Sequence, residues 1–146
     1  MASRPIIVFP TDFSDLSLGA HPWLARLQAA LDAEVHCVHV VQEPPPYTLL
    51  ELGTVPLPTL AQLRAGAEQG LANFARRHLA DLRVTAVRVL AGRPAEAVVD
   101  YAREQGAALI VLTTHGYGGV RRALLGSTTE AILREAACPV LSVRSH

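Results

Sequence analysis

A short run of glycine and hydroxyl residues near the C-terminus has the composition of a phosphate-binding turn. Gly126 is followed by Ser127, Thr128 and Thr129, and then by an apolar helical segment. The first turn of a helix presents unpaired backbone N–H groups at the positive end of the helix dipole, and such groups bind anions. The same residues also fit an ordinary capping box, Ser127-x-x-Glu130. Local sequence therefore leaves two interpretations, a phosphate site and a helix cap.

The loop before this turn carries three further glycines, Gly116, Gly118 and Gly119. A plain connection rarely needs that much backbone freedom, which favours a ligand over a simple cap. His115 opens the loop, where it either polarises a bound phosphate or satisfies local backbone groups.

A second group of polar residues follows the first apolar run of the chain. Pro10, Thr11 and Asp12 come directly after it, and Ser14 follows two residues later. Asp12 is either a turn residue that caps the next helix or an acceptor for a ligand. Because Ser14 is equally well placed to cap, we expect Asp12 to be freer to accept hydrogen bonds from a ligand.

The elements that must position these residues alternate regularly along the chain. Apolar runs without strict in/out alternation indicate parallel strands covered on both faces. The predicted strands are Pro5–Pro10, Glu34–Val41, Val84–Leu90, Ala108–Leu112 and Pro139–Val143. The predicted helices are Ser14–Leu31, Thr59–Leu82, Pro94–Gln105 and Ser127–Ala137. This alternation predicts an open, doubly wound α/β sheet with right-handed crossovers.

Ligands of such sheets bind beyond the carboxyl ends of the strands, where the winding direction reverses. If the reversal lies between the first and fourth strands, Asp12 and the glycine-bearing loop face each other across one crevice. Two features of the helices are also expected: Pro22 kinks or restarts the first helix, and Gly106 ends the third. The first helix carries an apolar stripe, which we expect to face the core: Leu16, Ala20, Trp23, Leu24, Leu27 and Leu31.

Composition excludes several classes of protein. The chain has 146 residues, which suits one domain over residues 1–146, with a proline-rich loop at 43–58. Its 13 acidic residues balance 13 basic ones, so no broad attraction to nucleic acid or anionic membrane is expected. All 13 basic residues are arginine, which excludes Schiff-base and phosphate-loop lysines. No dinucleotide fingerprint, zinc-ligand spacing or Gly-x-Ser-x-Gly turn is present.

The compartment is predicted from the cysteines and the apolar runs. Cys37 and Cys138 lie far apart in apolar surroundings, as expected for buried thiols in a reducing cytosol. The longest uninterrupted aliphatic stretch, Ala107 to Leu112, is far short of the ~20 residues that span a bilayer. We therefore expect a cytoplasmic protein without a membrane span.

In combination, several motifs give the chain a resemblance to the universal stress protein family over essentially its full length. The matching segments are Ile7 to Ser14, His39-Val40-Val41, Gly92-Arg-Pro94, Thr113 to Ser127 and Cys138 to Arg144. The resemblance implies an adenine nucleotide alpha hydrolase-like fold, a five-stranded parallel sheet in the order 3-2-1-4-5 with helices on both faces. In that order the reversal falls between strands one and four, where the residue pattern needs it.

The resemblance also implies a ligand, because the ATP-binding branch of the family carries Gly-x-x-Gly, nine residues, and Gly-Ser/Thr. Gly116, Gly126 and Ser127 match this motif, whereas Thr113 stands at its first glycine. Thr113 is β-branched and is expected to crowd a ribose or phosphate resting against the backbone. The implied cofactor is ATP, with Mg²⁺ as the accompanying divalent metal.

The residues implied to bind the nucleotide divide into two groups. Asp12 and the Val40 backbone would hold adenine or ribose, and the glycine motif with Thr128 would hold the triphosphate. The full predicted set is Pro10, Thr11, Asp12, Val40, Thr113, His115, Gly116, Gly126, Ser127 and Thr128.

Taken together, these observations predict a cytoplasmic ATP-binding stress-response regulator that forms a homodimer through its last strand. The alternative is a universal stress protein without nucleotide that acts as a dimeric protein-interaction module, an interpretation favoured by Thr113. No general base is evident for a hydrolase, because Asp12 would be engaged with the sugar or base, so at most slow ATP turnover is expected.

Overall fold

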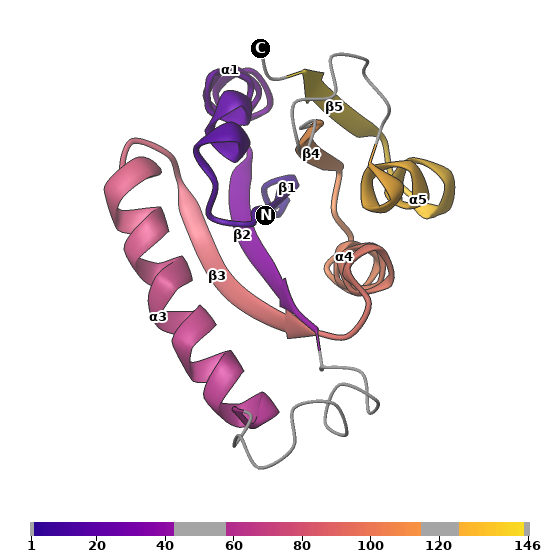
Figure 1. Cartoon of the computed structure of the whole chain (residues 1–146). Coiled ribbons are helices and arrows are strands. Elements are labelled where there is room, and N and C mark those ends of the chain that lie inside the picture. The colour runs from indigo at the N-terminus through magenta and orange to yellow at the C-terminus, as the bar shows by residue number, and fades with distance from the viewer. Residues whose placement is uncertain (1, 43–57, 115–125, 145–146) are drawn as a thin grey trace.

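Five parallel strands form a single sheet in the order β3-β2-β1-β4-β5. The computed structural model describes residues 2–42, 58–114 and 126–144. Its strands are β1 (Ile6–Pro10), β2 (Glu34–Val41), β3 (Val84–Ala91), β4 (Leu109–Thr114) and β5 (Val140–Arg144). The predicted fold class and strand order are therefore confirmed (Figure 1). The main difference is that β4 ends two residues later than predicted, which places Thr113 inside the strand.

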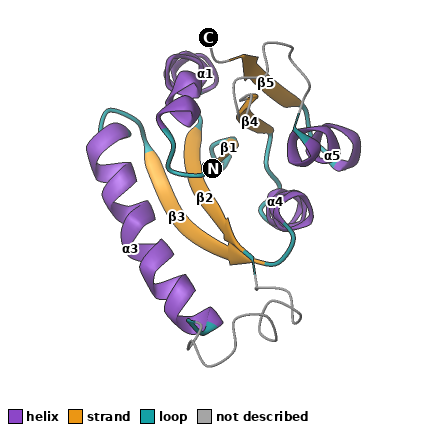
Figure 2. Ribbon diagram, viewed as in Figure 1, coloured by secondary structure: helices purple, strands orange, loops and turns teal. Residues whose placement is uncertain are grey.

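Helices cover both faces of the sheet (Figure 2). They are the 3-10 helix η1 (Asp15–Ala20) and the α-helices α1 (His21–Leu31), α3 (Leu60–His78), α4 (Pro94–Glu104) and α5 (Ser127–Glu135). The predicted first helix is divided in two, and Pro22 lies in the first turn of α1, where its missing N–H costs nothing. Thr59 and Gln62 form a capping box that starts α3, and Gly106 follows α4 with a φ of +62°.

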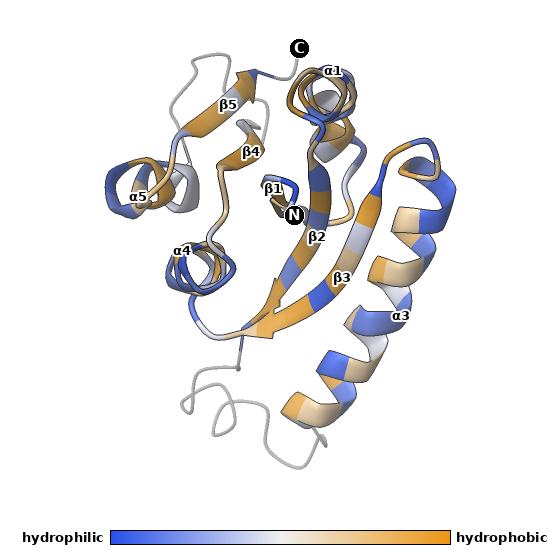
Figure 3. Ribbon diagram, turned by 180° about the vertical axis from the view of Figure 1, so that it is seen from behind, coloured by the Kyte–Doolittle hydropathy of each residue, from blue (hydrophilic) through white to orange (hydrophobic). Residues whose placement is uncertain are grey.

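The core has two halves, one on each face of the sheet. On one face, Phe9 packs with α1 through Leu24 and with α3 through Leu71. On the other, Val8 and Val38 pack with residues of α4 and α5. Apolar residues accordingly concentrate on the strands and polar ones on the outer sides of the helices (Figure 3).

The stripe predicted for the first helix is only partly correct. Ala20 and Leu24 are buried, but Leu16, Trp23 and Leu31 are 43%, 42% and 45% exposed. For Leu16 the reason is the change from 3-10 to α geometry at His21, because the two helix types advance by different angles per residue. A single 3.6-residue period across both segments therefore puts Leu16 out of phase with α1. Trp23 and Leu31 both lie within α1, and that change does not explain their exposure.

The winding direction reverses at β1, which lies between β2 and β4. The chain leaving β1 enters η1 and α1, whereas the chain between β4 and β5 includes α5 on the opposite face. The register between β1 and β4 holds only for Ile7 with Leu109 and Val8 with Ile110. Beyond that point the two strands are no longer paired, which is the geometry of a crevice at a topological switch point.

Candidate functional site

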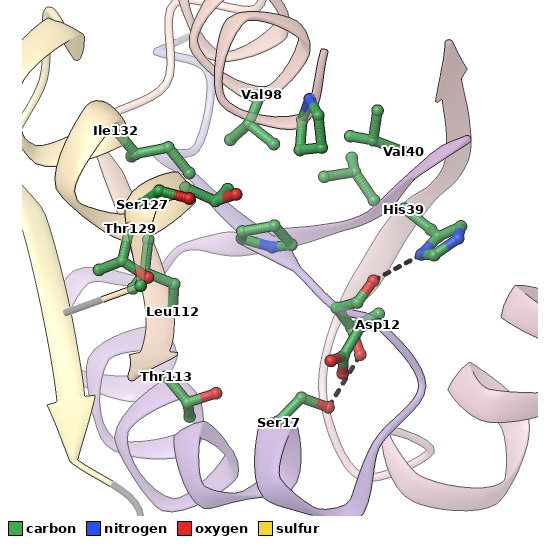
Figure 4. Close-up of a pocket in the computed structure, with 16 residues that line it drawn as sticks. Asp12, Ser17, His39, Val40, Val98, Leu112, Thr113, Ser127, Thr129 and Ile132 are labelled. Carbon is green, nitrogen blue, oxygen red and sulfur yellow. Dashed lines mark hydrogen bonds between the residues drawn. The ribbon is translucent and has the colours of Figure 1, made fainter. Parts of the chain in front are cut away.

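A cavity of about 320 Å³ lies beyond the carboxyl ends of β1 and β4 (Figure 4). This volume is within the range of small-molecule sites in proteins. The cavity is lined by Pro10, Thr11, Asp12, Ser17, Val38, His39, Val40, Pro94, Val98, Leu112, Thr113, Gly126, Ser127, Thr128, Thr129 and Ile132. Every predicted site residue within the described part of the chain belongs to this lining. His115 and Gly116 lie outside the described residues.

The turn after β1 is held by a directional chain of hydrogen bonds. The Ser17 hydroxyl donates to the carbonyl of Ser14 at 2.7 Å, so the Thr11 hydroxyl must be the donor in its 2.8 Å bond to Ser17 Oγ. The Phe13 N–H in turn donates to Thr11 Oγ1 at 3.1 Å. Both Thr11 and Ser17 are buried, so this chain satisfies polar groups that water does not reach.

Asp12 is fixed by Ser14 rather than released by it. Ser14 caps η1 by accepting from the N–H of Ser17, as anticipated. However, Ser14 also donates its N–H, at 3.0 Å, and its hydroxyl to Oδ1 of Asp12. The expectation that capping by Ser14 leaves Asp12 freer is therefore wrong, because the same serine serves both. The half-buried Asp12 carboxylate is oriented at the rim of the cavity.

The backbone of Val40 faces the cavity past the end of β1. Alternate residues of a strand direct their backbone groups to the same side. The carbonyl of Val38 accepts from the N–H of Thr11 on the β1 side, whereas the carbonyl of Val41 accepts from Gly92 on the β3 side. Val40 therefore points its N–H and C=O toward β1, which has already ended at Pro10. One donor and one acceptor are thus presented side by side at the cavity wall.

The opposite end of the cavity is the N-terminus of α5. Gly126 is its N-cap residue, Ser127 is the first helical residue, and in the described chain no side-chain hydrogen bond caps the helix. The first intrahelical bond runs from the N–H of Glu130 to the carbonyl of Gly126 at 3.0 Å. The capping-box interpretation is therefore wrong by one position. The backbone N–H groups of the first turn have no intrahelical acceptor, and a Cβ added at Gly126 would meet no described atom within 4 Å.

Thr113 occupies the floor of the cavity. Its side chain is only 5% exposed and lies in the part of the lining that also contains Ser17 (Figure 4). The residue at the first glycine position of the nucleotide motif is thus buried at the site and takes up space there.

The lining residues that local sequence did not single out are mostly apolar. They are Ser17, Val38, His39, Pro94, Val98, Leu112 and Ile132. Val38 and Leu112 were identifiable only as residues of predicted strands, and both pack on the α4 and α5 side of the sheet. His39 is half-buried in β2, and its Nδ1 lies 2.8 Å from the carbonyl oxygen of Thr11. In the described ranges, no cluster of three or more His, Cys, Asp or Glu is arranged to bind a metal.

These features define a doubly wound α/β protein with a ligand crevice at its switch point. A family model described as the universal stress protein family matches residues 4–144, and the chain belongs to that family. Universal stress protein MJ0531 of Methanocaldococcus jannaschii is 34% identical over 139 residues, covering 94% of this chain and 81% of the relative.

Two solved structures show the same fold. A universal stress protein in complex with cAMP has a TM-score of 0.67 and 23% identity, covering 99% of this chain and 100% of its own. The universal stress protein from Archaeoglobus fulgidus in complex with dAMP has a TM-score of 0.65 and 19% identity, covering 98% and 99%. Within the described residues, no helix has the length and apolar character needed to cross a membrane.

Proposed function

We propose that the protein binds an adenine nucleotide, with ATP as the expected ligand, and acts as a cytoplasmic stress-response regulator of one domain. The observation that carries this proposal is the pairing of two chemically different ends in one cavity. The Val40 backbone lies at one end among apolar side chains, and the N-terminus of α5, with glycine as its N-cap residue, lies at the other. Two solved structures with this fold are complexes with cAMP and with dAMP, which supports an adenine nucleotide as the ligand class.

The walls of the cavity suit a purine base. Val38, Val98 and Ile132 supply apolar surface from β2, α4 and α5. Adenine presents an amino donor beside a ring-nitrogen acceptor, and the backbone C=O and N–H of Val40 complement that pair. Asp12 would accept from a ribose hydroxyl, since a carboxylate is an acceptor only.

The phosphates would lie against the first turn of α5. The N–H groups and hydroxyls of Ser127 and Thr128 supply donors there, with Gly126 allowing close approach. Asp12 is the one acidic side chain in the described lining. Mg²⁺ would therefore be held chiefly by the nucleotide's own phosphates, as is usual for this ion.

A direct test is to denature the purified protein and chromatograph the supernatant for released nucleotide. A second test follows thermal unfolding with MgATP. A ligand at 100 times its dissociation constant stabilises the native state by about 2.7 kcal/mol. Absence of both bound nucleotide and any shift at millimolar MgATP would leave the alternative, a protein-interaction module. Phosphate release by wild type and by Asp12→Ala then decides whether any turnover occurs.

Matched variants locate the site. Gly126→Val adds bulk where phosphate is expected, whereas Gly66→Val adds the same bulk on α3, where no described atom lies within 4 Å of an added Cβ. Asp12→Ala removes the rim carboxylate, and Asp100→Ala removes an exposed one on α4. The affinity for MgATP should fall only for the Gly126 and Asp12 variants. Equal affinities in all four variants would show that the nucleotide does not bind in this cavity.

We also propose a homodimer paired through β5. This strand is at the edge of the sheet and has β4 as its one sheet neighbour in the described chain. An unpaired edge presents backbone donors and acceptors to a second copy.

A further inference from the structure

Phe13, in the turn between β1 and η1, has an unfavourable backbone conformation. Its φ is +68°, and the one other non-glycine residue of the described chain with positive φ is Asp32. Bulky side chains rarely adopt this left-handed region. Such a conformation persists only where surrounding contacts impose it, and it commonly accompanies a functional site. Phe13 directly follows Asp12, so its backbone sets the direction of the rim carboxylate.

The Phe13 ring is held on the α3 side of the sheet. It stacks on the His39 ring with centroids 4.2 Å apart and planes 29° from parallel. Phe74 of α3 lies at 6.2 Å between ring centroids. The ring also approaches α3 at Gly70, where an added Cβ would lie 3.7 Å from it. The Phe13 ring thus lies within van der Waals distance of α3 at Gly70.

His39 connects this aromatic contact to the backbone of the turn. Its Nδ1 lies 2.8 Å from the carbonyl oxygen of Thr11 (Figure 4). A carbonyl only accepts, so Nδ1 carries the proton and donates. The turn is then fastened from two sides, since the N–H of Thr11 donates to Val38 and its carbonyl accepts from His39.

We propose that His39 is a positioning residue of the nucleotide site, acting through the Thr11 carbonyl and the Phe13 ring. The cavity wall is formed by Val38 and Val40, whose side chains pack toward α4 and α5. His39 lies between them in sequence, and its ring stacks on Phe13 toward α3. Contacts on the α3 side of the sheet, where α3 itself contributes no residue to the cavity lining, thereby fix the turn that presents Asp12. This inference rests on the proposed function.

The test uses two amide side chains that differ in reach. In His39→Asn the amide nitrogen is bonded to Cγ, as Nδ1 is in histidine. In His39→Gln it lies one bond further out, where it cannot replace Nδ1. We expect His39→Gln to weaken binding of AMP and MgATP by about tenfold, the scale of one lost hydrogen bond, and His39→Asn to retain most of the affinity. Equal affinities of the two variants would overturn the proposal.

A second measurement needs no nucleotide. Amide exchange of Phe13 and Ser14, both donors within the turn, should accelerate by at least about tenfold in His39→Gln and stay near wild type in His39→Asn. His36→Gln is the control, because it alters the same strand on the α4 side. If wild type binds no nucleotide, the proposed function fails, and the exchange rates alone decide whether His39 fixes the turn. Unchanged exchange rates in His39→Gln would show that His39 does not fix the turn.

A further variant separates backbone strain from the ring contact. Phe13→Gly relieves the positive φ, since glycine adopts it freely, but it removes the ring that stacks on His39. We expect weaker nucleotide binding despite the relaxed backbone. Binding as tight as wild type would show that the aromatic contact positions nothing.

Discussion

The buried ring of His36 on β2 is hydrogen-bonded to the hydroxyl of Tyr101 on α4 at 2.9 Å. On its other side, Nε2 lies 3.4 Å from a carboxylate oxygen of Glu34. The Tyr101 hydroxyl is thus the hydrogen-bond partner of Nδ1, and the Glu34 carboxylate is an ion-pair neighbour of Nε2. Strand and helix are thus joined by a polar contact inside an apolar layer.

Tyr101→Phe should therefore destabilise the fold, although it keeps the aromatic ring and removes only the hydroxyl group. It leaves Nδ1 of a buried histidine without its hydrogen-bond partner, which costs about 1–3 kcal/mol. The free energy of unfolding in urea measures the effect. Combining it with His36→Phe in a double-mutant cycle should recover part of the loss, since both polar partners are then absent. A Tyr101→Phe protein as stable as wild type would contradict the assignment.

A surface ion-pair cluster predicts how stability depends on pH. Hydrogen bonds from Arg83 and then Arg4 hold the pKa of Asp32 below its ordinary value. A carboxyl with a lowered folded pKa stabilises the native state above its unfolded pKa, and the stabilisation is lost as pH falls through the folded pKa. Asp32→Asn should therefore reduce stability at neutral pH and make the decline between about pH 5 and pH 3 shallower.

Thermal unfolding across that pH range tests this expectation. Asparagine tolerates the left-handed conformation of residue 32, whose φ is 49°, so the substitution isolates the charge. Asp100→Asn removes a different exposed carboxylate and controls for net charge. The stability difference between wild type and Asp32→Asn should shrink in high salt, because the ion pairs of Asp32 with Arg83 and Arg4 are exposed. A pH profile parallel to wild type would show that Asp32 contributes nothing.

The two cysteines should differ sharply in reactivity. Cys37 is fully buried in β2, and burial raises the pKa of its thiol to about 12. Cys138 is partly exposed, with its pKa raised chiefly by burial as well. The thiolate is the reactive form, so iodoacetamide at pH 8 should label native protein at Cys138 only, and slowly. Mass spectrometry would show two labels after unfolding; rapid native labelling of Cys37 would mean that β2 opens.

The edge of the sheet gives a test of the dimer. The carbonyl of Pro139 accepts from Ile110 of β4, so by strand alternation Ser142 directs its N–H away from β4. Ser142→Pro removes that outward donor and leaves the ladder to β4 intact. We expect the dimer to dissociate at least about tenfold more readily, measured by light scattering after size exclusion. Ser142→Ala keeps the N–H and is the control; a monomeric wild type at every concentration would overturn the dimer itself.

How far the sequence predicts this molecule depends on the range of the interactions involved. Short-range patterns predict the alternation of strands and helices, because apolar runs and helical periods are read over a few residues. The strand order, and with it the crevice between β1 and β4, is implied by the family resemblance and not by those patterns. The cap of α5 does not follow from them either, since Ser127-x-x-Glu130 looks the same whether Ser127 is the cap or the first helical residue. The bond from His39 to Thr11 spans 28 positions, and no local pattern encodes it.

Thr113 offers the last and most specific test of ligand choice. Replacing it by glycine restores the first position of the nucleotide motif and empties space in the cavity floor. We expect Thr113→Gly to bind MgATP more tightly relative to AMP, while losing about 1–2 kcal/mol of stability because a buried β-branched strand residue is removed. Thr113→Ser keeps the hydroxyl and removes only the methyl group, so an intermediate preference would assign the crowding to that methyl. Calorimetric titration of wild type and both variants with the two nucleotides measures the ratio, and an unchanged ratio in Thr113→Gly would mean that the phosphate tail passes clear of β4.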